Sequence, residues 1–409
     1  MPLPMVDGNA TLEFNKVEGG LYVNRDDILD RAREMVPVLR ERASEAEGLR
    51  RIPEETARDF RSAGFYRVLQ PRRYGGLELA FGTQTELAII LAPGCASSAW
   101  VACITACHAW IFGMFPPAAQ DEVWGADEDA TISSSFLPIA AELHQADGGI
   151  RISGRWKFSS AVDYCAWSLL TMDVDDGSGG RERLFMVVPL ADCTIEDTWH
   201  TTGLAGTGSN DIVVDDLFVP THRTVRSAKI QGGPSPGSAV NDGYLYRLPQ
   251  HATFSFNIVG TAIGGARGAI RAAITELTGR NTVSGARLAE LSSVHLRVAE
   301  AEAEVAAAYA LMARNRDEII ADAEAGRIAS AVDRARYRRD NAYAGRLCVQ
   351  AVDRIYPLMG GRGIATDSTV NRAWRDVHAV AHHIALTWDN QAAPSGALAV
   401  GVDRTRPNS

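Results

Sequence analysis

The sequence predicts a mainly α-helical fold with a small β domain between two helical regions. Apolar residues recur at helical spacing over most of the first and last thirds of the chain, whereas the middle third holds short alternating or β-branched runs separated by Gly, Asp and Ser. The chain has 409 residues, which exceeds the ~250 to 300 at which one core usually stops growing. We therefore expect three packed domains, at residues 1–125, 126–235 and 236–409.

The first region is expected to be helical throughout. Residues 25–47 carry apolar side chains at the spacing of one helix face, and Pro53 then opens a second helix at its first turn. A turn-rich stretch follows at residues 64–76. Helical patterns return over residues 83–91 and 97–115, so the N-terminal domain is predicted as a helical bundle.

The middle region is predicted to be rich in strands. Its candidate strands are short, β-branched or alternating, and they lie at residues 131–135, 150–153, 155–159, 167–173, 184–189 and 211–219. A loop rich in Gly and Pro at residues 230–243 then marks the place where the chain leaves the strands. We expect these strands to form a compact, barrel-like β domain.

The last region is predicted as a four-helix bundle. Four long segments rich in Ala and Leu have helical periodicity, at residues 254–280, 288–325, 328–356 and 371–388. The order of helices, a small β domain and a helical bundle is uncommon, and it narrows the choice of fold considerably.

Composition excludes several classes of partner. The net charge is −9 and no basic run is present, which removes the attraction that drives most binding to nucleic acids and anionic membranes. The apolar runs are shorter than the ~20 residues that span a bilayer, and residues 1–16 lack the pattern of a secretory signal. Six scattered cysteines without a CxxC pair suggest reduced, packed thiols. We expect a cytoplasmic protein.

Two segments carry a family resemblance. Residues 202–220 (TGLAGTGSNDIVVDDLFVP) and residues 356–376 (YPLMGGRGIATDSTVNRAWRD) are similar to the β-domain exit and the Gly-Gly turn of acyl-CoA dehydrogenases. Gly360 and Gly361 allow a turn with positive φ or a close approach to a ligand, and Arg362 supplies a permanent cation for a phosphate. A helix-connecting turn with a surface arginine would account for this Gly-Gly-Arg segment taken alone, but the ordered pair of segments favours the family.

The residues after the Arg-Asp pair depart from the dehydrogenase pattern. Many dehydrogenases of this family have a Glu-Gly-Thr sequence there, and its glutamate abstracts the substrate α-proton. Residues 378–384 read HAVAHHI and contain no carboxylate. Other members hold the glutamate elsewhere on the bundle, so an acyl-CoA dehydrogenase or flavin oxidase stays an alternative. A catalytically silent scaffold on the same fold is a third hypothesis.

The hydroxylase branch of the family fits better. Residues 154–161 (GRWKFSSA), His108 in HAW and His383 after WRD resemble the two-component flavin-dependent aromatic hydroxylases. The resemblance implies an oxygenase component that uses O2 and reduced FMN or FAD, through a C4a-hydroperoxyflavin, to hydroxylate a small phenolic or indolic substrate. No GxGxxG motif opens a helix, so a separate NAD(P)H:flavin reductase is expected as partner. The resemblance also implies a homotetramer.

The same resemblance implies a set of residues that contact the flavin. Ser159 is expected beside flavin N5 with Ser160 as its neighbour, where a hydroxyl restrains proton loss. Trp156 and Phe158 are expected to form the wall of the isoalloxazine, and Trp199 to flank the ring system. The phosphate is expected to be held at the bundle, by Arg280, Gly361 and Arg362.

Three residues are expected to act on the substrate. The resemblance implies His108 and His383 as acid/base groups, because an imidazole titrates near neutral pH and a phenol is attacked more easily as it loses its proton. Ser134 is expected near the substrate or the flavin edge. Neighbouring residues remain as alternatives to two of them, namely Ser133 and Ser135 to Ser134, and His382 to His383.

Plain structural roles and a metal site also remain open. His108 fits equally well as a satisfied core histidine beside Trp110 and Phe112 on a buried helix. Two pairs of potential ligands lie one helical turn apart, namely His378 with His382, and Cys103 with Cys107 followed by His108. Carboxylate ligands are not evident near either pair, so we expect no metal.

Overall fold

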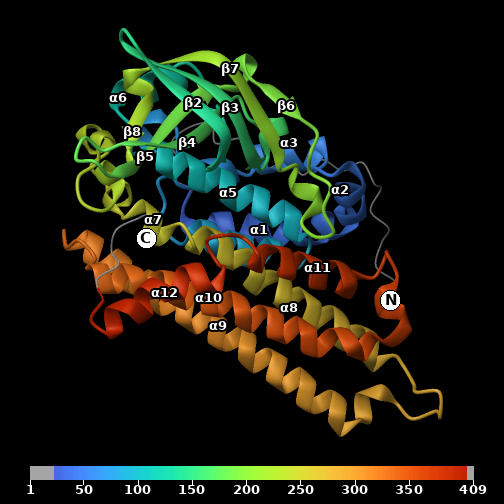
Figure 1. The fold of residues 1–409 in the computed structure, drawn as a ribbon. Helices are drawn as coiled ribbons and strands as arrows, with labels where there is room; N and C mark the ends of the chain where they lie inside the picture. The colour runs from blue at the N-terminus through green and yellow to red at the C-terminus, as the bar shows by residue number, and fades with distance from the viewer. Residues whose placement is uncertain (1–22, 403–409) are drawn as a thin grey trace.

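The computed structural model describes residues 23–402. The two β-sheets lie at one end of the molecule, the N-terminal helices lie in the middle, and the long C-terminal helices form the opposite end (Figure 1). The N-terminal stretch in which we expect no secretory signal, residues 1–16, lies outside the described residues. Our proposed boundaries at residues 125 and 235 both fall between helices and strands.

The N-terminal region is helical, as predicted. Its helices are α1 (Arg25–Glu41), α2 (Ala43–Leu49), α3 (Glu54–Ser62), α4 (Thr83–Leu91), α5 (Ala96–Phe112) and α6 (Pro117–Val123). The single helix predicted over residues 25–47 divides into α1 and α2 at Arg42. Every residue of α5 is buried, because this helix lies between the sheets and the bundle (Figure 1). α5 is therefore a rigid support on which side chains of the other two regions converge.

The middle region consists of two four-stranded sheets. One has the order β1-β4-β5-β8, with bounds Ile132–Ser135, Trp167–Asp175, Arg181–Pro189 and Thr224–Arg226. The other has the order β2-β3-β7-β6, with bounds Leu137–Ala146, Gly149–Ser159, Asn210–Pro220 and Thr194–Glu196. Trp156, Met186 and Ile212 belong to a separate hydrophobic core formed by residues of both sheets. The predicted strands 150–153 and 155–159 are one strand, with an irregular register at Gly154.

The C-terminal region is a helical bundle, as predicted. Its helices are α7 (Gln250–Thr253), α8 (Phe256–Thr278), α9 (Ser292–Glu324), α10 (Ala331–Ile355), α11 (Thr369–Ala381) and α12 (Trp388–Ala399). The helix predicted over residues 371–388 is wrong over residues 383–387, because the chain leaves helical geometry after His382 and begins α12 at Trp388. None of the helices described in residues 23–402 combines the length and the apolar character needed to cross a membrane.

The two segments that carry the family resemblance meet in space. The backbone N–H of Leu204 donates a hydrogen bond of 2.7 Å to the buried carboxyl of Asp376 on α11. Gly203 lies so close to the carbonyl oxygen of Arg375 that a Cβ atom at this position would overlap with it. Glu47 of α2 pairs with Arg372 at 2.9 Å and with Arg375 at 2.5 Å. The β-domain exit, the bundle and the N-terminal helices are thus joined at one point.

Candidate active site

His108 lies on α5 and is 1% exposed. Its Nδ1 is 2.9 Å from the carbonyl oxygen of Ile132. A carbonyl only accepts hydrogen bonds, so Nδ1 carries the proton of the neutral ring and Nε2 is left as an acceptor. Nε2 is 2.7 Å from the hydroxyl oxygen of Ser134, and the Ser134 hydroxyl therefore donates to it. The tautomer of His108 follows from this network.

Burial determines the charge of His108. Desolvation lowers the pKa of the imidazole to about 4, although the hydrogen bond to Ile132 opposes the change. The ring is therefore neutral at pH 7. Because the hydroxyl proton of Ser134 is directed to His108, the lone pairs of the Ser134 oxygen remain available to a donor such as a phenolic O–H.

The three consecutive serines of β1 have different partners. Side chains alternate between the two sides of a strand, so Ser133 and Ser135 point away from the side that Ser134 occupies. Ser133 receives a hydrogen bond of 3.1 Å from Ser159, and Ser135 donates to the carbonyl oxygen of Lys157. Of the three, only Ser134 forms a hydrogen bond with His108.

Trp100 connects α5 with both the β domain and the bundle. Its indole N–H donates to Ser160 at 3.0 Å, and Ser160 shares a hydrogen bond of 2.7 Å with Ser209. On the other side, the Trp100 ring meets the His383 ring edge-on, with 5.5 Å between centroids. Sequence analysis did not identify Trp100, although it precedes His108 by eight residues, or two steps of four along α5, a spacing that keeps both near one helix face.

His383 follows α11 and faces inward, whereas His382 is exposed. His382 bonds to the carbonyl of His378. Nδ1 of His383 accepts a hydrogen bond of 3.1 Å from the backbone N–H of Ala385, so the proton of the neutral ring lies on Nε2. Phe254 lies against the same ring at 6.0 Å, and desolvation lowers the pKa of His383 to about 4.

The two imidazoles thus have complementary roles at pH 7. His108 accepts a hydrogen bond through Ser134, and His383 carries a free donor at Nε2. Trp100, whose ring contacts His383, lies eight residues before His108, which corresponds to about 12 Å along the axis of α5.

Comparison with known proteins identifies the family. Residues 256–388 match the family described as "Acyl-CoA dehydrogenase, C-terminal domain". The chain is 34% identical over 388 residues to the "FADH(2)-dependent resorcinol hydroxylase, oxygenase component" of Rhizobium sp. (strain MTP-10005), covering 92% of this chain and 94% of the relative. The chain belongs to the flavin-dependent monooxygenase oxygenase components.

Solved structures of this family share the fold. The crystal structure of 3-HSA hydroxylase from Rhodococcus sp. RHA1 is 31% identical, has a TM-score of 0.88 and covers 93% of this chain and 98% of its own. XiaF from Streptomyces sp., solved in complex with FADH2 and glycerol, is 26% identical, has a TM-score of 0.84 and covers 93% and 96% of the two chains. The predicted acyl-CoA dehydrogenase-like architecture and the hydroxylase branch are confirmed.

Phe158 and Trp199 form an aromatic surface that suits a planar cofactor. Phe158 is 54% exposed, adopts a positive φ of 68°, and its ring lies 5.9 Å from that of Trp199. The indole N–H of Trp199 donates to the carbonyl of Leu204 at 3.0 Å, which fixes its ring. Ser159 and Ser160 follow directly in the chain. Phe158 thus offers an open aromatic face, whereas Trp199 is half-buried and the hydroxyls of Ser159 and Ser160 are buried and bonded to other serines.

Trp156 is placed elsewhere, and we withdraw it from the flavin-contacting set. Its side chain is 0% exposed within the core of the two sheets, and its indole N–H donates to the carbonyl of Thr171 at 2.8 Å. A ring with no open face cannot form a wall for a ligand. The irregular register between Trp156 and Ser159 separates Trp156 from the exposed Phe158, and the sequence motif carried no sign of this irregularity.

Arg280, Gly361 and Arg362 do not join the His383 cluster within one chain. Arg280 contacts the carbonyl oxygen of Met359 at 3.3 Å and pairs with Glu276 at 2.9 Å, so it anchors the Gly-Gly turn. Gly361 and Arg362 are exposed in that turn. The turn precedes α11 and His383 follows it, and the 13 residues of α11 correspond to about 20 Å.

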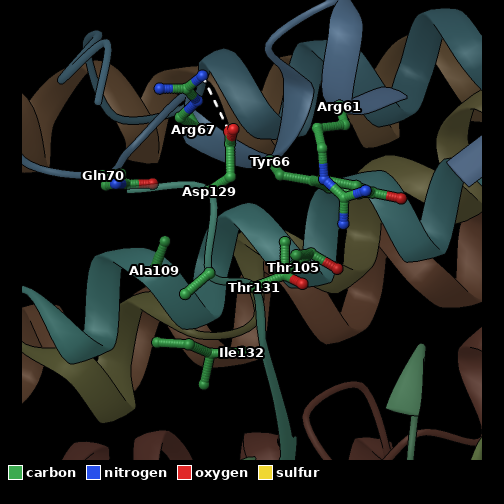
Figure 2. A pocket seen from close by; sticks show the side chains of 10 residues that line it. Arg61, Tyr66, Arg67, Gln70, Thr105, Ala109, Asp129, Thr131 and Ile132 are labelled. Carbon is green, nitrogen blue, oxygen red and sulfur yellow. Dashed lines mark ion pairs between the residues drawn. The ribbon is translucent and has the colours of Figure 1, made fainter. Parts of the chain in front are cut away.

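A small cavity lies beside α5 and borders the cluster at Ile132, whose carbonyl oxygen bonds to His108. It measures about 10 Å³ and is lined by residues that include Tyr66, Thr105 and Ile132 (Figure 2). The hydroxyls of Tyr66 and Thr105 have no hydrogen-bond partner among residues 23–402, and the space is about that of one water molecule. The cavity is too small for an aromatic substrate.

The two candidate metal-ligand pairs have other partners. His378 bonds to Asp353 at 2.9 Å, and Cys103 donates to the carbonyl of Asn257 at 3.2 Å. Within residues 23–402, no three His, Cys, Asp or Glu side chains come together as metal ligands would.

Proposed function

We propose that this protein hydroxylates a small phenolic or indolic ring with O2 and reduced FMN or FAD supplied by a separate NAD(P)H:flavin reductase. The observation that carries the proposal is the hydrogen bond from Ser134 to the neutral, buried His108. Reduced flavin, when bound, supplies the electrons that activate O2 for transfer of one oxygen atom to the ring. The residues of the chain supply binding, orientation and proton control.

Ser134 and His108 are suited to receive the substrate hydroxyl. A phenolic O–H that donates to Ser134 shares its proton with a hydroxyl already polarised towards His108. The pKa of His108 is about 4, so the free imidazole is a weak base. A phenolate forming beside it would raise that pKa, because an opposite charge nearby favours the imidazolium. Proton transfer is thus coupled to activation of the ring.

His383 is suited to donate to an oxygen on the opposite side of the substrate. Its free Nε2–H is held in direction by the bond from Ala385 to Nδ1 and by the rings of Trp100 and Phe254. These aromatic rings partly cover the imidazole, which is half-buried, and the resulting desolvation lowers its pKa. Exclusion of water suppresses side reactions of reactive oxygen species.

Asp376 does not replace the missing dehydrogenase glutamate. Its carboxyl is buried and accepts the N–H of Leu204, so it is held by the β-domain exit. This contact gives no support to the alternative of an acyl-CoA dehydrogenase.

We also propose a cytoplasmic homotetramer. Large apolar side chains lie exposed on or beside the C-terminal helices, with Leu296 at 65%, Ile328 at 58% and Val332 at 61%, and such surfaces commonly pack against other subunits. The Gly-Gly turn and His383 lie at opposite ends of α11, about 20 Å apart along its axis. A flavin whose phosphate is held by Arg280 and Arg362 is therefore expected to bind mainly to a neighbouring copy.

An oxygen-dependent screen tests the proposed activity. Purified protein is mixed with an aromatic substrate panel, a flavin reductase, NADH and FMN or FAD, and products are identified by mass spectrometry. We expect little tightly bound yellow flavin, and a hydroxylated product with one oxygen atom derived from ¹⁸O2. Product formation with NADH but without reductase would contradict the two-component proposal.

A further inference from the structure

Four basic side chains converge beside the aromatic residues of the candidate site. We call them the basic cluster: Arg183 of β5, His251 of α7, and Arg334 and Arg338 of α10. Arg334 and Arg338 lie one helical turn apart and therefore share a face of α10. Arg334 bonds to Gln231, which forms a β-bridge with Pro249, two residues before His251. Arg183 bonds to Phe136, whose ring contacts Phe254, three residues after His251.

Two of the arginines lack a balancing carboxylate. Nε of Arg338 donates to the amide oxygen of Gln391 at 2.7 Å, and Nη1 of Arg334 donates to the carbonyl oxygen of Gln231 at 3.1 Å. Both acceptors are neutral, and no ion pair is recorded for either arginine among residues 23–402. Arg338 is partly buried, and desolvation lowers its pKa. A partly buried guanidinium without a counter-ion is costly, so this arrangement favours binding of an anion.

The other two members of the basic cluster, Arg183 and His251, also suit the binding of an anion. Arg183 pairs with Asp173 at 3.0 Å, so part of its charge is already balanced. Desolvation and then the three arginine charges lower the pKa of His251 to about 4, although the residue as a whole is exposed at the surface. At pH 7 its neutral ring is thus able to add a hydrogen-bond donor without adding charge.

A chain of contacts joins the basic cluster to His383. Nη1 of Arg183 donates to the carbonyl of Phe136 at 3.2 Å. The Phe136 ring lies 5.6 Å from that of Phe254, which lies 6.0 Å from His383. His251 and Phe254 are three residues apart at α7, close to one helical turn. An anion at the basic cluster would thus be about one turn of helix from a ring packed on Phe254.

We propose that the basic cluster binds the carboxylate of an aromatic acid whose ring lies against Phe254 and His383. The inference rests on the proposed function and specifies its substrate class as a phenolic or indolic ring that bears a short acidic side chain. Arg338 is the central residue, because its planar guanidinium suits a carboxylate and, within residues 23–402, its side chain bonds to a neutral amide and forms no ion pair. The basic cluster could bind a flavin phosphate through the same charged contacts, so the substrate carboxylate and the flavin phosphate are tested in separate experiments.

Matched acids and amides test the substrate arm. Dissociation constants are measured by calorimetry on the full-length chain for para-hydroxybenzoate, para-hydroxyphenylacetate, para-hydroxyphenylpropanoate and indoleacetate, and for the carboxamide of each. We expect at least one acid to bind about ten- to a hundredfold more tightly than its amide, the range for a charge-assisted contact. If no acid gains at least tenfold over its amide, the proposal is overturned.

A variant and a control locate the effect. Arg338→Gln is expected to remove most of the preference for the acid while leaving binding of the amide within about twofold, an allowance for small packing changes. Arg354→Gln is the matched control, because Arg354 lies on the same helix but pairs with Glu300 and Glu304. Thermal unfolding verifies that both variants fold. An unchanged preference in a folded Arg338→Gln protein would overturn the assignment.

Measurements of flavin binding test whether the basic cluster holds the flavin phosphate instead of a substrate carboxylate. Reduced FMN and reduced riboflavin differ in the phosphate, and their relative affinities are expected to be the same in the parent and in Arg338→Gln. A selective loss of FMN affinity with no loss for the acids would assign the cluster to the cofactor and overturn the proposal. These binding experiments and the activity screen test different claims. Hydroxylation of neutral phenols without a preference for acids would contradict only the proposed substrate class. Binding of acids without hydroxylation would contradict only the proposed reaction.

Discussion

Trp100 and His383 meet edge-on with their ring centroids 5.5 Å apart. Trp100 lies on the fully buried α5, whereas His383 lies in the turn between α11 and α12. The indole N–H of Trp100 is also bonded to Ser160 at the end of β3. One side chain thus sets the position of the bundle's imidazole relative to the hydroxyls of the β domain.

The first prediction concerns His383. We expect His383→Ala to lower the rate of hydroxylation by about 10²- to 10⁴-fold, the usual contribution of a positioned acid/base group, while the affinity for reduced flavin changes little. The exposed neighbour His382 provides the control, and His382→Ala should retain near-normal rates. Single-turnover kinetics with reduced flavin and O2 measure the effect. Equal losses in both variants would show that the turn, rather than the imidazole, matters.

The second prediction concerns Ser134. We expect Ser134→Ala to lower the hydroxylation rate of a phenol by at least about tenfold, because the substrate O–H loses its link to His108 and one hydrogen bond to a polar partner contributes about 1.5 kcal/mol. Ser135→Ala is the control, since Ser135 points to the other side of β1 and bonds to the backbone of Lys157. A pH-rate profile for each variant checks the assignment. Indistinguishable profiles for Ser134→Ala and the parent would refute the relay.

Much of the fold is readable from the sequence, because long amphipathic helices repeat their apolar pattern many times. Helices α8, α9 and α10 begin and end within a few residues of their predicted bounds. Strands β2, β6 and β8 were missed. Of these, β2 has no buried residue, and β6 and β8 have three residues each, so none carries a sustained buried face.

The site was less predictable than the fold. Neighbours in sequence have divergent environments here: Ser134 faces His108 while Ser133 faces Ser159, and His383 faces inward while His382 is exposed. Spacing within a motif cannot show which of two neighbouring side chains faces the site, because that depends on strand register and on where a helix ends. The withdrawal of Trp156 has the same cause, since an irregular register in β3 decides which aromatic ring is open.

The third prediction concerns Gly203 at the junction of the two motif segments. We expect Gly203→Ala to destabilise the protein by about 1 to 3 kcal/mol, the usual cost of overpacking, because the new methyl group would overlap with the carbonyl of Arg375. Gly48→Ala is the control, since no atom lies within 4 Å of its Cβ position on α2 and alanine is the better helix former. Chemical denaturation measures both. Equal stability of Gly203→Ala and the parent would show that the loop does not pack on α11 as described.

The last prediction concerns the pH dependence that Asp376 confers. Desolvation raises the pKa of its buried carboxyl from 3.8 to about 6, so the folded protein holds this proton more tightly than the unfolded chain does. Between these two pKa values the folded state binds more protons, and the contribution of Asp376 to stability is therefore full at low pH and is lost as the pH rises towards 6. The loss should approach roughly 3 kcal/mol, at 1.36 kcal/mol for each pKa unit.

The variant Asp376→Asn tests the direction of this pH dependence of stability. The amide oxygen of asparagine is able to accept the N–H of Leu204 as the carboxyl does, but it does not titrate. We therefore expect the stability of the variant relative to the parent to increase as the pH rises from about 4 to 7, in denaturant titrations at fixed ionic strength. The difference is the informative quantity, because it cancels the titration of all other groups. A flat difference for Asp376→Asn would mean that its carboxyl is not desolvated at the junction.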